Sequence, residues 1–550
     1  MDITQELLPI EQFAQVANSK PDVVYWRQPV NRVYKETTWA EAYDKTLRLA
    51  AGSRSLGLQP GDKVALLSEN CAEWFLTDFA IMAAGLISVP IYFSAGEKTI
   101  SYVLEHSSAK AIVVGKMANY SAVKNVLDND FLTIAMPYDT LACKHQLEEL
   151  IESNSPLEDL AKPDFDDVFS ITYTSGSTGK PKGVVLTFRN LVFGATATFR
   201  FPNRPEELRV LSYLPLAHIT ERALIEYASL YGEAEVGFVE SLATFVDDLR
   251  AAKVTWFISV PRLWMKFQAG VLAKLPQKKL DRMLRIPILS GIVKRKIKQQ
   301  LGLEHVENCG SGSAPIAPSI LEWYEKIGLY ISEGWGMTEV TGMATTHFPF
   351  RVDKIGTIGQ AIEGLEIKMS DEGEILVRGD AVFKEYYNNA QITKETFTED
   401  GWMRTGDRAK IDDEGFLYIT GRVKELFKSG KGKYVAPVPI ESLMVQNQLI
   451  EQICVMGSGL PQPMAVLVLA PETSSGISKY DIQTSLEETL DLVNRQLEKH
   501  ERLGGLCIAK GTWSVDNGLL TPTLKIKRDL LEERYASLIE HETGDTIVWE

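Results

Sequence analysis

Residues 171–190 read ITYTSGSTGKPKGVVLTFRN and constrain the fold more than any other stretch of the chain. An apolar run of β type comes first, followed directly by Gly, Ser, Thr and Lys residues. Small residues let backbone N–H groups close around phosphate oxygens, while hydroxyls and ammonium groups add donors and positive charge. A Gly/Ser-rich run on its own is more often a surface linker, but the preceding strand favours a phosphate-binding loop. That loop comprises Thr174, Ser175, Gly176, Ser177, Thr178, Gly179 and Lys180.

The loop differs from a Walker A sequence. Such a sequence needs four residues between its first Gly and the Gly-Lys pair, whereas only two separate Gly176 from Gly179 here, and Pro181 takes the hydroxyl position. Residues 188–195 then carry apolar side chains at helical spacing. We therefore expect the loop to join a strand to a helix.

Length and patterning predict more than one domain. With 550 residues and 45% hydrophobic content, the chain exceeds a single compact unit. Strands and helices alternate over residues 62–115 and again over 168–260, which predicts α/β sheets covered by helices. The pattern becomes charged and glycine-rich after residue 421, so we expect a large N-terminal domain, 1–421. Residues 422–550, with two apolar strands and an amphipathic helix over 481–500, predict a small α+β domain.

Composition excludes several classes of protein. A net charge of −15 argues against nucleic acid as a main partner, because binding phosphates needs a basic face. The five scattered cysteines form no CxxC pair, so we expect neither a disulfide framework nor a zinc site. The N-terminus lacks the pattern of a signal peptide, and the apolar run 79–93 is shorter than the roughly 20 residues that span a bilayer. A reduced cytoplasmic setting fits best.

One stretch opposes the overall charge. Residues 274–298 hold nine Lys and Arg residues against Asp281 alone, nine minus one or +8, with apolar residues interleaved. Such a segment can lie on an anionic membrane surface. A solvated helical excursion is the alternative.

Further motifs follow the loop in sequence order. They are LPLAHITER at 214–222, GSGSAPI at 310–316, EGWGMTE at 333–339, DGWMRTGD at 400–407, GRVKELFKSGKGKYVAPVPIE at 421–441 and LLTPTLKIKR at 519–528. Together with the loop they resemble the AMP-forming adenylating enzymes, which include acyl-CoA synthetases, luciferases and peptide-synthetase adenylation domains. The DGW sequence is more typical of the fatty acyl-CoA synthetases, and the resemblance covers nearly the whole chain.

The resemblance implies a site for ATP and Mg²⁺. The implied adenine pocket comprises Gly312, Ser313, Ala314, Gly334, Trp335 and Gly336. Thr338 and Glu339 would face the phosphates, and Thr174 and Glu339 would hold the metal through oxygen ligands. Asp407 would accept hydrogen bonds from the ribose, with Arg422 beside it. The alternatives are a core aromatic for Trp335, a helix cap for Glu339 and a turn residue for Asp407.

Four further residues take catalytic or hinge roles by the same resemblance. Lys525 would bridge the substrate carboxylate and the α-phosphate, although Leu524 stands where the commoner pattern has Gly, as in long-chain members. His218 would lie between acyl pocket and phosphates, and Lys424 would be the hinge of a mobile C-terminal domain. Lys428 would lie on the face used in the second step. The neighbouring Lys527 and Arg528 are alternatives to Lys525, as is a role of Lys525 as a plain surface lysine. A structural histidine is the alternative for His218.

The acyl site is less well marked. Residues 254–267 resemble the segment that separates nucleotide and acyl sites in long-chain members, so Trp256 and Trp264 are candidates for a gate, with core packing as the alternative. We expect ATP-dependent activation of a medium- to long-chain fatty acid, transfer to CoA and release of AMP. An acyl-AMP ligase serving a carrier protein, a CoA ligase for another carboxylate and a silent binding protein are the alternatives. Oligomeric state stays open.

Overall fold

The computed structural model describes residues 3–127, 131–138, 141–174, 180–200, 204–515, 517–521, 525–540 and 546–550. Its largest sheet has the strand order β19-β9-β8-β4-β3-β5-β6-β7. These strands are β3 (Lys63–Leu67), β4 (Ile87–Ile91), β5 (Ala111–Val114), β6 (Leu132–Ala135), β7 (His145–Gln146), β8 (Val168–Thr174), β9 (Lys182–Thr187) and β19 (Glu385–Tyr386). Strand β3 is parallel to both β4 and β5, which confirms the α/β pattern predicted for 62–115.

Helices alternate with these strands. They are α1 (Pro9–Ser19), α2 (Trp39–Ser55), α3 (Ala72–Ala83), α4 (Glu97–Ser107), α5 (Ser121–Val126), α6 (Leu147–Ser153) and α7 (Phe188–Ala197). All but one of the twelve residues of α3 are buried, including Trp74, Phe75 and Phe79. A helix that is apolar on all sides belongs inside a core. It therefore packs in the largest hydrophobic core, with α1 and α2.

Three further sheets complete the larger part of the molecule. One contains β1 (Val24–Val30), β2 (Val33–Thr38), β10 (Arg209–Ser212) and β11 (Glu235–Phe238). The next contains β12 (Trp256–Ser259), β13 (Asn308–Ser311), β14 (Ile331–Trp335), β15 (Thr345–Thr346) and β16 (Gln360–Ala361). The last contains β17 (Leu365–Met369), β18 (Glu374–Gly379), β20 (Met403–Ile411) and β21 (Leu417–Arg422).

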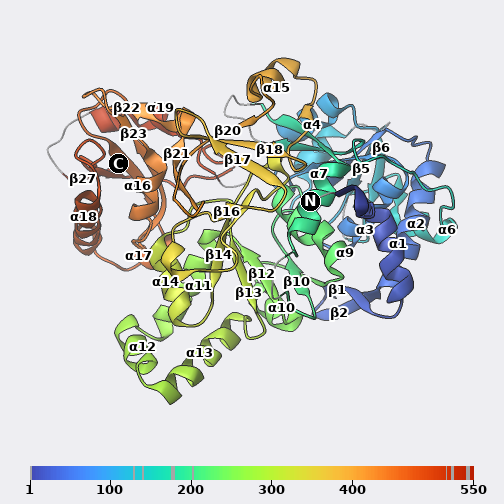
Figure 1. The fold of residues 1–550 in the computed structure, drawn as a ribbon, viewed down its shortest axis with the longest axis horizontal. Coiled ribbons are helices and arrows are strands. Elements are labelled where there is room, and N and C mark those ends of the chain that lie inside the picture. Colours follow the sequence, from blue (N-terminus) through green and yellow to red (C-terminus); the bar gives the residue numbers. More distant parts are fainter. Residues whose placement is uncertain are drawn as a thin grey trace.

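The remaining helices of this part lie between those strands. They are α8 (Ile219–Glu221), α9 (Ala228–Gly232), α10 (Phe245–Ala252), α11 (Pro261–Lys274), α12 (Gln277–Leu284), α13 (Pro287–Leu301), α14 (Pro318–Lys326) and α15 (Ala390–Thr396). Figure 1 shows α12 and α13 projecting at the lower edge of the molecule. Their inner faces close a second core with α10, α11 and α14.

The C-terminal residues form their own core. The sheet contains β24 (Ile450–Met456), β25 (Met464–Leu469), β26 (Leu506–Ile508) and β27 (Ile547–Trp549), beside a ribbon of β22 (Phe427–Lys428) and β23 (Tyr434–Val435). Helices α16 (Pro437–Met444), α17 (Pro471–Ser474), α18 (Lys479–Gln496) and α19 (Arg528–Glu540) accompany them. Figure 1 shows these orange-to-red elements together at one side. The fold is thus a large α/β part with a smaller mixed part, as expected; the boundary at 421/422 stays a prediction.

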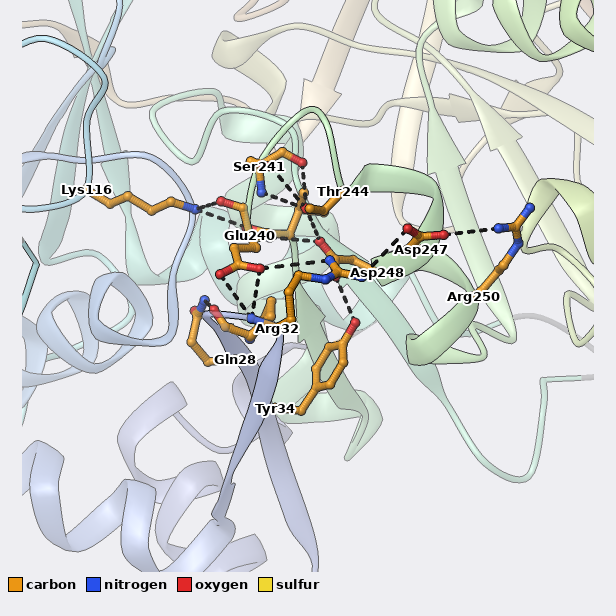
Figure 2. Close-up of polar contacts among 12 residues, drawn as sticks. Gln28, Arg32, Tyr34, Lys116, Glu240, Ser241, Thr244, Asp247, Asp248 and Arg250 are labelled. Carbon is orange, nitrogen blue, oxygen red and sulfur yellow. Dashed lines mark hydrogen bonds and ion pairs between the residues drawn. The ribbon is translucent and has the colours of Figure 1, made fainter.

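A polar clasp ties the N-terminal hairpin to the larger part. Asp248 in α10 is buried and accepts hydrogen bonds from Arg32 Nη1 at 3.1 Å, Tyr34 Oη at 2.8 Å and the Glu240 backbone N–H at 3.0 Å. Figure 2 shows these groups converging, with Lys116 reaching the Glu240 carbonyl from the other side. We call this cluster the Asp248 clasp. It joins β1–β2, β11 and the loop after β5.

Candidate functional site

The phosphate loop lies between two antiparallel strands. Thr174 ends β8 and Lys182 begins β9, and the two residues pair across the strands. The prediction that the loop joins a strand to a helix is therefore wrong, because KGVVLT, with its β-branched residues, forms strand β9 before α7 begins. Ser175, Gly176, Ser177, Thr178 and Gly179 lie outside the described residues.

Lys180, the last residue of the loop, and Lys182, the first residue of β9, lie over aromatic rings. Lys180 Nζ is 5.7 Å from the ring centre of Tyr102, and Lys182 Nζ is 5.1 Å from that of Tyr386. A cation–π contact holds an ammonium group against a ring without neutralising its charge. Both lysines therefore remain suited to binding phosphate.

The ends of β13 and β14 carry the predicted adenine residues. The two strands are parallel, Gly312 follows β13, and Gly334 and Trp335 end β14. A Cβ on Gly312 would lie 3.1 Å from the Gly334 carbonyl oxygen, so the two backbones approach closely. Ser313 has φ +67°, and both it and Ala314 are exposed. Exposed backbone and a half-buried indole ring therefore lie together, as contact with a purine requires.

Asp407 links Trp335 to Arg422. Trp335 Nε1 donates to Asp407 Oδ2 at 2.9 Å, and Arg422 Nε donates to Oδ1 at 2.7 Å. Asp407 and Arg422 lie opposite each other on β20 and β21. An ionised carboxylate accepts about four hydrogen bonds, so Asp407 keeps accepting capacity for two ribose hydroxyls.

Glu339 is held by Tyr386, a residue that the motifs did not predict. The Tyr386 hydroxyl donates to Glu339 Oε1 at 2.7 Å, and only 6% and 7% of the two residues is exposed. Within the described ranges Oε2 has no hydrogen-bond partner. Mg²⁺ commonly takes one or two carboxylates together with substrate phosphates. The carboxylate therefore fits the expected metal, and Thr174 stays a predicted ligand.

The turn that carries Glu339 requires glycine. A Cβ on Gly336 would lie 2.2 Å from the Gly342 carbonyl oxygen, closer than any side chain allows. Thr338 and Glu339 begin the short 3-10 helix η3 (Thr338–Val340) directly after this turn, and both are buried. The close approach of two backbone segments thus fixes where η3 starts.

Lys525 reaches the same cluster from the C-terminal part. Burial, and then the charge of Arg422, lower the pKa of Lys525, while the carboxylates of Asp407, Glu339 and Glu425 oppose the shift. Part of the Lys525 surface nevertheless remains exposed to solvent. Lys525 thus lies within electrostatic reach of the ribose and metal carboxylates.

Thr521 holds the backbone of Lys525. The Lys525 N–H donates to Thr521 Oγ1 at 3.1 Å, and the Lys525 carbonyl accepts from the Thr521 N–H at 2.8 Å. Leu520 and Ile526, on either side of these two residues, form a β-bridge. Leu520 is part of a hydrophobic cluster of the C-terminal part, and Ile526 packs against that cluster.

His218 faces Lys525 and is neutral at pH 7. Burial, and then the charge of Lys525, lower the pKa of His218 to about 4. Its Nδ1 accepts a hydrogen bond from the Thr220 N–H at 3.2 Å. The π-helix η2 (Arg222–Tyr227) follows α8, and its fully buried Arg222 contacts Asp78 Oδ2 at 2.5 Å and Ser170 Oγ at 2.7 Å. Helix α3 and strand β8 thereby fix the segment that carries His218.

The hinge candidate and the second-step candidate lie outside this cluster. Lys424 is exposed in the 3-10 helix η5 (Val423–Glu425), directly after β21. Lys428 is exposed on β22 and its Nζ lies 5.1 Å from the Tyr434 ring centre. Their roles stay predictions.

The two tryptophans of the predicted gate have different surroundings. Trp264 has no exposed surface and donates from Nε1 to the Gly310 carbonyl at 3.3 Å, next to the adenine motif. Trp256 is 7% exposed and packs edge-on against Phe199 and tilted against Phe348. Trp264 packs as a core residue in this conformation, and the role of both residues as a gate stays a prediction.

Comparison with known families agrees with this arrangement. Residues 10–387 match the model of the AMP-binding enzyme family, and residues 427–542 match the AMP-binding enzyme C-terminal domain. The chain belongs to the AMP-binding enzyme family. It is 32% identical to the long-chain-fatty-acid–CoA ligase FadD15 of Mycobacterium tuberculosis, with 94% of each chain covered. It is 30% identical to the peroxisomal long chain acyl-CoA synthetase 7 of Arabidopsis thaliana, over 92% of this chain and 81% of the relative.

Solved structures share the fold of this family member. The adenylation domain of a carboxylate reductase from Mycobacterium chelonae superposes with a TM-score of 0.83 at 22% identity, covering 98% of this chain and 92% of that chain. The o-succinylbenzoate CoA synthetase of Bacillus subtilis, in complex with an acyl-adenylate intermediate, gives a TM-score of 0.74 at 22% identity, with 95% and 97% covered. The chain is therefore an adenylate-forming enzyme by fold and family.

Proposed function

We propose that this enzyme activates a fatty acid of medium to long chain with ATP and then transfers the acyl group to CoA. The observation that carries the proposal is the convergence of Lys525 with Glu339, Asp407 and Arg422, because it unites positive charge, a metal ligand and ribose contacts. The relatives named as long-chain fatty acid ligases support the choice of substrate.

In the first half-reaction the substrate carboxylate would attack the α-phosphorus of ATP, giving acyl-adenylate and pyrophosphate. Lys525 would bind the attacking carboxylate and the α-phosphate together, which orients both and stabilises the charge that develops. Trp335 and Asp407 would hold adenine and ribose, while Lys180 and Lys182 would bind phosphates. Mg²⁺ held by Glu339 would shield the negative charge of the triphosphate.

In the second half-reaction a thiol would attack the acyl carbon and release AMP. The C-terminal part would first rotate about Lys424, which withdraws Lys525 and brings the face with Lys428 to the site. Such gating lets one site run two reactions in order. CoA is the expected thiol substrate.

A carrier protein is the alternative acceptor of the acyl group, and one structural comparison supports it. An acyl-AMP ligase would pass the acyl group to a carrier protein, and the structural match to a carboxylate reductase adenylation domain fits that class as well. Purified enzyme supplied with ATP, a fatty acid and CoA should form free acyl-CoA. Pyrophosphate release without any CoA thioester would instead favour the carrier-protein acceptor, and a substrate outside the fatty acids would favour a ligase of another carboxylate.

The proposal includes a location. No helix among the described residues is long and apolar enough to cross a membrane. We place the enzyme in the cytoplasm, in peripheral contact with the membrane through residues 274–298, where a poorly soluble fatty acid collects.

A further inference from the structure

The projecting pair of helices α12 and α13, with Arg285 and Ile286 between them, is called here the basic hairpin. Its anchored face is apolar: Leu280, Val293, Ile297 and Leu301 are buried in the second core. No described residue covers the opposite face, and Figure 1 shows the hairpin standing clear of the neighbouring elements. It is thus an ordered, supported element with one unpartnered side.

The tip of the basic hairpin exposes large apolar side chains. Ile286 is 51% exposed, Ile288 84% and Ile292 59%. Three such residues within 286–292 stand in contrast to the rest of the described chain, where exposed large apolar residues are scattered. Contiguous exposed apolar surface marks an interaction site.

Positive charge surrounds this apolar tip. Exposed cations are Lys274, Lys278, Lys279, Arg282, Arg285, Arg295 and Lys296, and Lys294 and Lys298 are half-buried. Arg295 pairs with Glu304 at 3.2 Å, and Asp281 accepts from Gln277. Among the described residues the other cations of the hairpin have no ion pair, so their charge is available to a partner.

A cleft beside α13 is also lined by basic side chains. It has a volume of about 480 Å³ and is lined by Gly291, Lys294, Arg295, Lys298, Glu304 and His305. Ammonium and guanidinium groups suit phosphate oxygens. Gly291, which lines the cleft, directly precedes the exposed Ile292 in the chain.

We propose that the basic hairpin docks on an anionic lipid bilayer, with the three isoleucines inserted among the acyl chains and the cations at the headgroup phosphates. A fold that combines an apolar tip with a basic flank matches the interface of a bilayer, where apolar and anionic layers lie in the same order. This inference deepens the proposed function, because the fatty acid would be drawn from the same bilayer. A protein partner or nucleic acid would not require an apolar tip that inserts.

Vesicle binding by the full-length enzyme tests this directly. Co-sedimentation should occur with phosphatidylcholine vesicles that contain phosphatidylglycerol, should be much weaker with phosphatidylcholine alone, and should decrease with salt because screening acts over about 10 Å at 0.1 M. Lys278, Lys279, Arg282 and Lys296 changed together to Gln should lower binding roughly 100-fold or more, since each basic residue contributes several-fold. Ile286, Ile288 and Ile292 changed together to Ser should also lower it. Changing the exposed Lys35, Lys98, Lys162 and Lys410 to Gln removes the same number of charges, so it is the matched control and should leave binding unchanged.

The outcomes separate this inference from the proposed function. The hairpin variants should unfold at the same temperature as the native enzyme and should turn over a short, soluble acid at the native rate, because the hairpin contributes no residue to the catalytic cluster. Native binding to anionic vesicles that both hairpin variants retain would overturn the inference. So would a native enzyme that ignores anionic vesicles at low salt, even if it ligates fatty acids normally.

Discussion

Lys525 supplies one positive charge where a carboxylate and a phosphate must meet. Changing Lys525 to Ala should lower ATP–pyrophosphate exchange at least about 100-fold, as removal of a single electrostatic contact to a transition state typically does. Conversion of supplied acyl-adenylate and CoA to thioester should be largely spared, because the thiol attacks the acyl carbon in that step and the α-phosphorus is not attacked. Near-normal exchange in the variant would show that Lys525 is not the catalytic lysine.

Tyr386 acts through Glu339. The change Tyr386→Phe removes the hydroxyl and keeps the ring under Lys182, so it should weaken binding of Mn²⁺ with a non-hydrolysable ATP analogue about 10–100-fold, the usual effect of losing a contact behind a metal ligand. Electron paramagnetic resonance of free Mn²⁺ measures this without turnover. In a Glu339→Gln variant, adding Tyr386→Phe should weaken Mn²⁺ binding no further. If it weakened binding there by the same factor, Tyr386 would not act through Glu339 and its role would be structural.

Glu333 makes stability depend on pH. Burial in β14 raises the pKa of Glu333 to about 8, against about 4.3 in an unfolded chain. The folded state therefore keeps the Glu333 proton up to a higher pH than the unfolded state does. The stability that this proton contributes is fully present below about pH 4.3 and is lost as the pH rises to about 8. Between these two pH values the free energy of unfolding of the native enzyme should fall as the pH rises. Glu333→Gln should make this slope shallower, by up to on the order of 1.4 kcal/mol per pH unit. Urea unfolding at the two ends of the window measures it, and an unchanged slope would contradict the assignment.

At the scale of elements, the Asp248 clasp holds the β1–β2 hairpin in place. Asp248→Ala leaves the Tyr34 hydroxyl and the Glu240 N–H without their acceptor, so it should lower the free energy of unfolding by about 2 kcal/mol. Asp247 is the matched control, because its side chain is 60% exposed. Asp247→Ala should change stability by less than about 0.5 kcal/mol. Equal losses in the free energy of unfolding for the two variants would show that the Asp248 clasp does not hold the hairpin in place.

The sequence predicted elements well where a pattern is local. Strands and helices over 62–115 follow from apolar periodicity, and the structure confirms them. Strand β9 was missed because the prediction relied on the helical spacing of apolar residues after 188 and did not assign KGVVLT to a strand. The Tyr386–Glu339 bond was also missed, since it joins residues 47 apart in sequence, and short strand β19 carries no motif. Long-range contacts of this kind depend on the packing of separate sheets.

At the scale of the molecule, the structure brings Lys525 of the C-terminal part to the larger part, as the proposed adenylation step requires. The charge of Lys525 acts on His218, and Ser319 Oγ in α14 donates to Gln446 Oε1 at 3.2 Å across the two parts. Arg262 in α11 contacts Glu451 in β24 in the same way. The rotation that we propose for the second half-reaction would break these polar contacts.

Restricting that linker should separate the half-reactions. Lys424→Pro fixes φ at the hinge and restricts the preceding residue, so pyrophosphate release should persist while thioester formation is lost. Lys424→Ala is the control and should retain both steps. If the proline variant lost both steps equally, general misfolding rather than a blocked rotation would be the explanation.

The most direct test of the account measures pyrophosphate and CoA thioester separately while the purified enzyme is offered acids of increasing chain length. Both products should form in equal amounts, with the highest kcat/KM for medium- to long-chain fatty acids. Absence of pyrophosphate release with every acid would contradict the account, leaving a nucleotide-binding protein without ligase activity.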